Sequence, residues 1–522
     1  VLQLPVPTGG DGLPMTERPP IDDLRQSVRP TLDDARPEAV AARRDKGYRT
    51  ARENLEDLCD PGSFLEYGQL AVAAQRNRRT ADDLRRNTPA DGVITGLATI
   101  NADRFGDAPG RAAVIINDYT VLAGTQGFFH HAKLDRILDL ARRERLPVVM
   151  YTEGGGGRPG DTDVTTQIAG LNLRTFSRWA GLAGHSLRIA VNNGYCFAGN
   201  AALFGCADLR VATRTSWIGM AGPAMIEGGG LGRFEATDIG PAEIQARNGL
   251  VDLLASDEAE ATALARRLLS YFQGAESECS CPGQASIGDL LPTDRRYSYH
   301  VREVIGTLAD SGSFLEITPE FGAAVITGFM RIEGRPLGVL ANDCRVLGGA
   351  IDADAAQKAA RFMRLCSRRG LPLLSLCDTP GFMVGPASEA QAAVRHMSDL
   401  FEAGAALSVP LVTVFLRKAY GLGAMAMAGG SFAEPLYAVS WPTGEFGGMG
   451  LEGAVRLGFR KELDAESDPQ RKQDLFDRLL RQLYEKGRAV EAAAHLEIDA
   501  VIEPADTRQH IVRALWPARP QP

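Results

Sequence analysis

A glycine-rich stretch that occurs twice constrains this chain more than any other feature. The later copy, residues 416–430, follows a strand-like apolar run at 410–416 and is rich in small residues and methionines. That order predicts a strand, a tight glycine turn and a buried helix that begins at the turn. The earlier copy, residues 193–203, aligns with the later one when Gly199 is placed on Gly423. The same strand–turn–helix unit is therefore expected at two places.

Other segments repeat at similar offsets and in the same order. The matched pairs are 62–66 with 312–316, 93–96 with 325–328, and 146–149 with 371–374. The last pair is followed by glycine-bearing turns, at 153–157 and 378–381. A repeat of this length is much longer than a solenoid unit. It indicates a duplicated domain, and 522 residues suffice for two domains.

The spacing of apolar residues predicts an α/β fold in each copy. We expect helices at 36–60, 133–145, 167–182, 257–272 and 470–494, and strands at 112–117, 147–151 and 187–191. Strands that alternate with helices are typical of a mostly parallel sheet covered by helices. We therefore expect a flexible N-terminal extension at 1–35, an N-terminal domain at 36–275, a Gly-, Ser-, Cys- and Pro-rich linker at 276–292, and a C-terminal domain at 293–522.

Composition excludes several kinds of partner. The net charge of −8, with no basic block, argues against nucleic acid. No apolar run reaches the roughly 18–20 residues of a membrane helix, and residues 1–20 lack a signal pattern. The eight cysteines include no CxxC pair, so we expect no metal site. Apart from Cys279 and Cys281, we expect them to be buried in a cytoplasmic protein.

Missing motifs narrow the chemistry. No Gly-Lys dipeptide, HExxH or GxSxG occurs, so a P-loop, a zincin site and a nucleophile elbow are absent. We interpret the pair His130 and His131 as a local polar feature. The two glycine turns remain: helix-start N–H groups lack internal partners, and glycine lets a ligand oxygen approach them. An isolated turn of this kind is more often only the start of a core helix, but the duplication favours an enzyme that stabilises enolate or oxyanion charge.

Five segments carry a resemblance to a known family. They are 51–68, 346–362, 378–382, 417–421 and 498–508. Through them, over roughly residues 36–510, the chain resembles the carboxyltransferase (beta) component of the biotin-dependent acyl-CoA carboxylases, within the crotonase superfamily. The resemblance implies two tandem crotonase-like (ClpP/crotonase) ββα-spiral domains, usually in a homohexamer. It also implies that the N-domain binds acyl-CoA and the C-domain binds carboxybiotin, across a subunit interface.

The resemblance also implies site residues. In the N-domain turn, the backbone donors for the thioester oxygen would be Ala198 and Gly199, with Asn200 next. In the C-domain turn, the donors for the biotin ureido oxygen would be Leu422 and Gly423, with Ala424 next. The further binding residues would be Gly154, Gly155, Gly156, Tyr420, Gly421 and Met425.

The function implied is carboxyl transfer from N1-carboxybiotin to the α-carbon of an acyl-CoA. The chain has no Met-Lys biotinylation site, so a biotin carboxyl carrier protein and a biotin carboxylase are expected as partners. Acetyl- and propionyl-specific relatives carry an aspartate at the position of Met425, so we expect a longer or branched acyl chain to be accepted. The alternatives are a biotin-dependent decarboxylase or transcarboxylase acting on a carboxyacyl-CoA, and a non-catalytic scaffold subunit.

Overall fold

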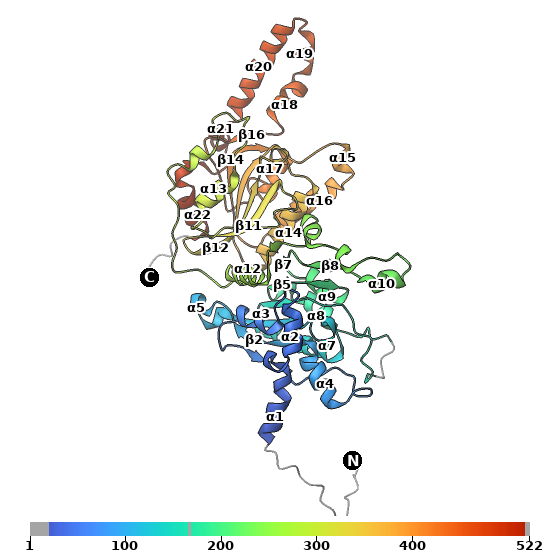
Figure 1. Ribbon diagram of the computed structural model, residues 1–522. Helices are drawn as coiled ribbons and strands as arrows, with labels where there is room; N and C mark the ends of the chain where they lie inside the picture. The colour runs from blue at the N-terminus through green and yellow to red at the C-terminus, as the bar shows by residue number, and fades with distance from the viewer. Residues whose placement is uncertain (1–19, 165–168, 517–522) are drawn as a thin grey trace, which may run out of the picture.

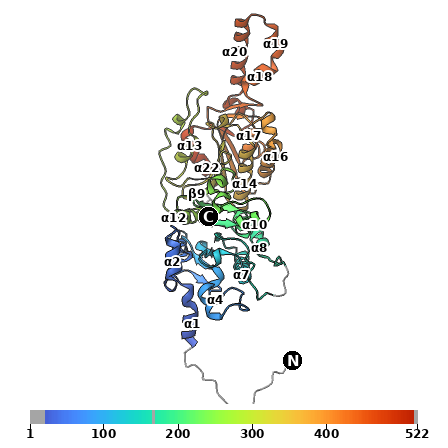
Figure 2. The same ribbon diagram turned by 45° about the vertical axis from the view of Figure 1, so that its right-hand side comes forward.

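The computed structural model describes residues 20–164 and 169–516. The chain forms two α/β halves stacked along one long axis, with the N-terminal half at the bottom of Figure 1 and a helical arm at the top. The 45° view of Figure 2 shows the same stacking.

A seven-stranded sheet forms the first half, in the order β1-β2-β3-β4-β5-β7-β9. The first three strands pair antiparallel and the others parallel. Their bounds are β1 Leu65–Glu66, β2 Val93–Thr99, β3 Arg111–Asn117, β4 Val148–Tyr151, β5 Arg188–Asn192, β7 Leu209–Thr213 and β9 Leu253–Ala255. A separate parallel pair joins β6 Tyr195–Phe197 to β8 Trp217–Gly219.

The second half repeats this plan in the order β10-β11-β12-β13-β14-β15-β17, again with three antiparallel strands followed by parallel ones. The bounds are β10 Leu315–Ile317, β11 Val325–Ile332, β12 Arg335–Asn342, β13 Leu373–Thr379, β14 Leu411–Tyr420, β15 Tyr437–Ser440, β16 Glu445–Gly447 and β17 Ala500–Val501. The long β14 pairs with both β15 and β16, and so covers the roles of β5 and β6 together. The duplication and the mostly parallel sheets predicted from the sequence are confirmed.

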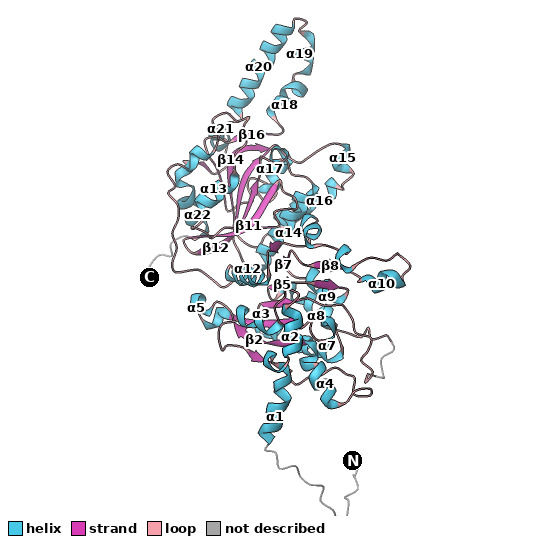
Figure 3. Cartoon of the chain, viewed as in Figure 1, coloured by secondary structure: helices cyan, strands magenta, loops and turns pink. Residues whose placement is uncertain are grey.

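Helices cover both sheets (Figure 3). In the first half they are α1 Pro20–Val28, α2 Pro37–Arg44, α3 Ala51–Leu58, α4 Ala81–Asn87, α5 Ala102–Phe105, α6 Asp107–Gly110, α7 Phe128–Glu144, α8 Thr175–Gly181, α9 Gly199–Gly205, α10 Pro223–Gly228, α11 Ala242–Arg247 and α12 Glu258–Ser270. In the second half they are α13 Val301–Leu308, α14 Ala353–Arg369, α15 Pro386–Glu389, α16 Ala393–Ala405, α17 Gly421–Met427, α18 Leu451–Gly458, α19 Arg460–Ala465, α20 Pro469–Lys486, α21 Ala489–Ala494 and α22 Thr507–Leu515. Helices α18, α19 and α20 make the arm that projects from the second half (Figure 1).

The single helix expected at 36–60 is wrong, because the chain breaks between α2 and α3. Thr50 ends the break as a capping box: its hydroxyl accepts from the N–H of Glu53, and the Glu53 carboxylate accepts from the N–H of Thr50. Such reciprocal bonds satisfy two helix-start donors and favour a new helix at this point. The expected helix at 470–494 is likewise divided, between α20 and α21. Of the helix expected at 167–182, residues 167 and 168 lie outside the described part, and the described residues are helical in α8 from Thr175.

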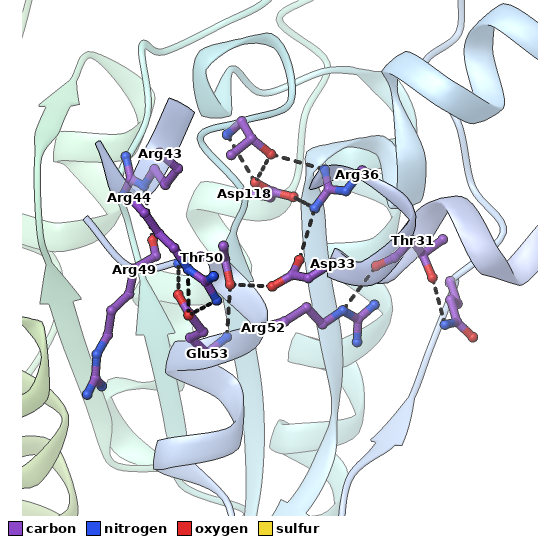
Figure 4. A network of polar contacts seen from close by, with 12 residues as sticks. Thr31, Asp33, Arg36, Arg43, Arg44, Arg49, Thr50, Arg52, Glu53 and Asp118 are labelled. Atoms are coloured by element: carbon purple, nitrogen blue, oxygen red, sulfur yellow. Dashed lines mark hydrogen bonds and ion pairs between the residues drawn. The ribbon is translucent and has the colours of Figure 1, made fainter. Parts of the chain in front are cut away.

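The extension expected to be flexible as far as residue 35 is structured from residue 20, and residues 1–19 lie outside the described part. Thr31, the last residue of the 3-10 helix Arg29–Thr31 that follows α1, is buried. Asp33 accepts from Thr50 (2.5 Å), and Arg36 pairs with Asp118 (2.9 Å) at the end of β3. Figure 4 shows these contacts linking the N-terminal segment to the first sheet. Side-chain contacts therefore order a segment whose composition alone predicted flexibility.

One hydrophobic core cluster contains residues of both sheets. On β3, Ala112, Val114 and Ile116 belong to this shared core, whereas Ala113 and Ile115 face the core under α7. This alternation follows from the two-residue period of a strand. Because both halves contribute to the shared core, each sheet holds the other in place. Between α12 and α13 the described chain has no regular element except the 3-10 helix Ile287–Leu290, and the linker that we place at 276–292 falls in this segment.

Candidate functional site

Both glycine turns lie where a parallel strand ends and a helix begins. In the first half, β6 ends at Phe197, Ala198 has φ 52° and ψ −119°, and α9 begins at Gly199. In the second half, β14 ends at Tyr420, and Gly421, with φ 57°, begins α17. Positive φ reverses the chain sharply, and only glycine adopts it without strain. Ala198 and Gly421 therefore hold equivalent corner positions.

The structural register differs by one residue from the alignment of Gly199 on Gly423. Strand pairing supports the corner positions, because Cys196 bridges to Gly154 in the first half and Ala419 pairs with Thr379 in the second. Counting from these residues, Gly199 corresponds to Leu422, and Asn200 corresponds to Gly423. The sequence alignment followed identical glycines, whereas the fold matches positions by backbone conformation.

The corner residue of the first turn has its N–H engaged. The Ala198 N–H donates to the carbonyl of Gly219 (3.1 Å). The next N–H groups, of Gly199 and Asn200, belong to the first turn of α9, where a helix offers no internal acceptor. The equivalent groups of α17 are those of Leu422 and Gly423. By this geometry the candidate donors of the first turn are Gly199 and Asn200, one residue further along the chain than the predicted pair, and those of the second turn are Leu422 and Gly423. Both pairs stay predictions.

The loop after β4 uses its own N–H groups to hold the turn. Gly154 donates to Tyr195 O (2.7 Å), Gly155 to Ala123 O (3.0 Å) and Gly156 to Asn200 Oδ1 (3.0 Å). A Cβ on Gly154 would lie 2.3 Å from Asn200 Nδ2, and Gly156 has φ 91°. The N–H groups of all three predicted binding glycines are therefore hydrogen-bonded within the protein, and none of them is free to donate to a ligand.

Asn200 fixes the start of α9 against this loop. Its side chain is fully buried, and besides accepting from Gly156 it donates to Thr152 O (3.1 Å). At the equivalent place the second half has Gly423, and a Cβ there would lie 2.7 Å from Gly381 Cα. The first half thus makes the contact with a side chain from the helix, whereas the second half makes it with bare backbone.

Gln126 is a candidate that sequence reasoning missed. Its side chain lies over the first turn, because a Cβ on Gly199 would be 2.3 Å from Gln126 Oε1. The residue is 4% exposed, and its Nε2 has no hydrogen-bond acceptor among the described residues. The second half has Ile351 here, with the same backbone hydrogen bond to the following loop. The sequence signal that could have identified Gln126 is that the repeat places this polar residue opposite the apolar Ile351.

A buried ion pair precedes each loop. Glu153 pairs with Arg43 of α2, with Nη1–Oε1 at 2.9 Å and Nη2–Oε2 at 2.5 Å. Asp378 occupies the same place in the second half and pairs with Arg417 of β14 (3.0 Å). Burial raises the pKa of Glu153 to about 7, although Arg43 acts in the opposite direction. Both acids lie at the end of the strand that leads into a glycine-bearing loop, β4 or β13, but they pair with arginines from different elements.

The predicted residues of the second turn differ in how exposed their side chains are. Leu422 is 60% exposed and Met425 is half-buried, whereas Ala424 is fully buried. Tyr420 is buried, its hydroxyl donates to Glu445 (2.8 Å), and burial raises its pKa. Met427, two residues after Met425, lies wholly in the core. The two turns are far apart within one chain, with α9 in the lower half and α17 in the upper half of Figure 1.

Other groups singled out from the sequence have local roles. His130 Nε2 contacts Asn117 Oδ1 (3.1 Å), and His131 Nδ1 contacts Thr175 Oγ1 (3.0 Å).

Residues 20–164 and 169–516 contain no group of three or more His, Cys, Asp or Glu arranged to hold a metal ion. Cysteines 59, 196, 344, 366 and 377 are buried, whereas Cys206 is exposed, contrary to expectation. No helix in the described residues is long and apolar enough to cross a bilayer.

Comparison with known proteins places this geometry in a family. The carboxyl transferase domain family matches residues 42–518. The propionyl-CoA carboxylase beta chain of Saccharopolyspora erythraea is 33% identical, over 97% of this chain and 95% of its own length. The methylmalonyl-CoA carboxyltransferase 12S subunit of Propionibacterium freudenreichii subsp. shermanii is 32% identical, over 91% of this chain and 90% of its own length.

Two solved structures extend the comparison. A single-chain, multi-domain long-chain acyl-CoA carboxylase is 54% identical, with a TM-score of 0.90 over 96% of this chain, which spans only 49% of that protein. The hexameric transcarboxylase 12S, solved with methylmalonyl-CoA bound, has a TM-score of 0.84 and is 28% identical, over 98% of each chain. The predicted crotonase-like tandem fold is therefore confirmed. The chain belongs to the carboxyl transferase domain family, as the sequence resemblance predicted.

Proposed function

We propose that this chain is the carboxyltransferase component of a biotin-dependent acyl-CoA carboxylase. It would transfer a carboxyl group from N1-carboxybiotin to the α-carbon of an acyl-CoA. The observation that carries the proposal is the pair of equivalent strand–corner–helix units, one in each half of a chain that matches the family over residues 42–518. Two similar anions must be stabilised on two different ligands, and a duplicated backbone site suits that task.

At the first turn, the N–H groups of Gly199 and Asn200 would receive the thioester oxygen. Negative charge develops on this oxygen when the α-proton leaves, and each preorganised donor contributes about 10²–10³ to kcat. The side chain of Gln126 lies beside the same turn and is the candidate for a third contact. Either its oxygen or its NH2 group is able to face the ligand, because an amide presents both.

At the second turn, the N–H groups of Leu422 and Gly423 fit an anionic ureido oxygen. Gly421 and Gly423 carry no side chain that would block its approach, and the exposed Leu422 is directed away from the core. When bound, carboxybiotin supplies the carboxyl group. The Tyr420 hydroxyl is bonded to Glu445, so at this turn we assign binding to backbone groups rather than to this side chain.

The two turns lie in different halves, so we propose that the active site forms between subunits of a homo-oligomer. Transcarboxylase 12S is a hexamer, and we propose the same assembly here. The biotin carrier and the biotin carboxylase would be separate chains or the remaining part of a longer polypeptide.

All eight cysteines are free, which supports a cytoplasmic location. The half-buried Met425 supports a longer or branched acyl substrate.

Transcarboxylation is a second candidate, favoured by the 32% identity to a methylmalonyl-CoA carboxyltransferase subunit. The test is to reconstitute the chain with a biotinylated carrier, a biotin carboxylase, ATP and bicarbonate, using acetyl-, propionyl-, butyryl- and longer acyl-CoA thioesters. We expect no carboxylation by the chain alone, avidin-sensitive carboxylation in the full mixture, and a kcat/KM for longer thioesters at least equal to that for acetyl-CoA. Avidin-resistant turnover would contradict biotin dependence, and a strict acetyl preference would contradict the acyl assignment.

A further inference from the structure

Two buried lysines occupy the same position in the two halves. Lys133 is the sixth residue of α7 and Lys358 the sixth residue of α14, and both helices have 17 residues. Both side chains are at least nine-tenths buried. A buried ammonium group is costly unless it finds acceptors, so their partners are worth comparing.

Lys133 is satisfied by the backbone. Its Nζ donates to Ala90 O (2.8 Å) and to Val93 O. Lys358 differs, because its Nζ has no hydrogen-bond acceptor within the described part of the chain. Burial lowers the pKa of both lysines to about 8, so the two differ in their hydrogen bonds and not in their pKa. The duplication has therefore left one ammonium bonded and the other without a partner.

The cause lies at a third duplicated position. Gly68 follows β1 with φ 71°, and a Cβ there would lie 3.0 Å from Cε and Cγ of Lys133. Thr318 follows β10 at the equivalent place, with φ 54°. Because a Cβ on Gly68 would crowd the side chain of Lys133, the side chain of Thr318 at the equivalent place is expected to close this path to Lys358. A β-branched residue at positive φ is unfavourable, and such strain often marks a functional site.

Lys358 and Thr318 both line a cavity of 350 Å³ at the junction of the two halves. Arg210 and Arg361 also line it, and both pair with the buried Asp252 (3.1 and 3.0 Å). A second aspartate in the wall, Asp208, is paired with Arg188 and Arg369. Both aspartates of the wall are paired with arginines, and Glu316, whose charge also acts on Lys358, is paired with Arg302 (2.6 Å). Among the described wall residues, Lys358 is therefore the cation without an ion pair of its own.

The remaining wall is apolar, with Leu209, Ile317, Phe321 and Phe362 among its residues. The cavity volume equals roughly a dozen water molecules. That is too small for a nucleotide or coenzyme A, and the apolar wall suits a hydrocarbon chain better than an inorganic anion. We propose that this cavity binds a small aliphatic carboxylate, which accepts a hydrogen bond from Lys358 and lays its chain against the apolar wall.

The site includes none of the residues of the two glycine turns, so the proposal is independent of carboxyl transfer. The test is calorimetric titration of the full chain with sodium hexanoate. The controls are 1-hexanol, which has the chain without the charge, and inorganic phosphate, which has charge without the chain. We expect hexanoate to bind more tightly than either control. Equal or tighter binding of hexanol or phosphate would overturn the proposal.

Variants locate the binding group. Lys358→Met should weaken hexanoate binding at least about tenfold, the loss expected for a hydrogen bond to a charged group. Lys133→Met, the matched control, should bind hexanoate as the wild type does but melt at a lower temperature, because two backbone carbonyls lose their partner. Thr318→Gly should reopen the path to the carbonyls and also weaken binding. Wild-type affinity in both Lys358→Met and Thr318→Gly would overturn the proposal.

Discussion

The first and second halves share a backbone plan but differ in the side chains that hold their turns. The first half has a non-glycine corner at Ala198 and fixes its helix with Asn200. The second half has glycines at both equivalent positions, 421 and 423. An α-carbon without a side chain allows the Gly381 loop to touch α17 directly. The shared backbone presents N–H groups in both halves, and we propose that the differing side chains adapt each turn to its own ligand.

The same contrast extends behind the turns. Gln126 places an amide with a free Nε2 over the first turn, where the second half has the apolar Ile351. Glu153 is tied to Arg43 from a separate helix, whereas Asp378 is tied to Arg417 from the adjacent strand. The first turn therefore depends on long-range contacts more than the second does. Four sets of substitutions test this comparison.

The largest effect is expected at Gly423. In Gly423→Ala the new Cβ meets the backbone of Gly381 at 2.7 Å, which cannot move away easily. We expect kcat for the reconstituted carboxylation to fall by at least about 10²–10³, together with a lower melting temperature. Gly199→Ala instead meets the side chain of Gln126, so the double variant Gly199→Ala/Gln126→Ala should relieve this clash and recover to the activity of Gln126→Ala alone. A Gly423→Ala protein with wild-type activity would contradict the backbone contact.

The next effect is on stability. Arg43→Met leaves Glu153 buried without its partner, which should lower the free energy of unfolding by about 3–5 kcal/mol. The control is Arg44→Met on the same helix: its ion pair with Glu53 is 59% exposed on the arginine side, and such pairs contribute about 0–1 kcal/mol. Urea unfolding measures both variants. Equal losses in the two would show that the buried pair does not hold the first turn.

A smaller effect is expected from exchanging the amide between the halves. Gln126→Ile copies the second half into the first and should lower kcat/KM for acyl-CoA about tenfold, the value of one good hydrogen bond. Decarboxylation of carboxybiotin without acyl-CoA should not change. The reciprocal Ile351→Gln buries an unpaired amide and should cost about 1–3 kcal/mol of stability. If Gln126→Ile affected both partial reactions equally, Gln126 would act on the fold and not on the acyl ligand.

The smallest effect concerns pH. Because the pKa of Glu153 is raised from 4.5 to about 7, the folded state holds this proton where the unfolded state has released it. The contribution of Glu153 to stability therefore declines as pH rises between these values. In Glu153→Gln, the change in unfolding free energy between about pH 5 and about pH 7.5 should be smaller than in the wild type. If the change in unfolding free energy between the two pH values were the same in Glu153→Gln and the wild type, the pKa of Glu153 would not be raised in the folded protein.

The duplication and the two turns were predictable because apolar runs and glycines are local signals. The exact register was not, because Ala198 occupies a corner that favours glycine, and the alignment followed glycine identities instead. The break before Thr50 could have been predicted, because Thr50 followed by Glu53 three residues later is the sequence signature of a capping box. The free amide of Gln126 and the free ammonium of Lys358 depend on contacts between distant segments. No periodicity in the sequence reports such contacts.

We propose that each turn serves its own ligand through its helix-start N–H groups. Gly199→Pro and Leu422→Pro delete equivalent donors at positions where proline is tolerated, and Gly199→Ala and Leu422→Ala retain them. The measurement is acyl-CoA enolisation, followed as α-proton exchange, beside carboxybiotin decarboxylation, at matched melting temperatures. Gly199→Pro should lose only the first reaction and Leu422→Pro only the second, each by about 10²–10³ relative to its alanine control. Equal loss of both reactions in either proline variant would contradict the account.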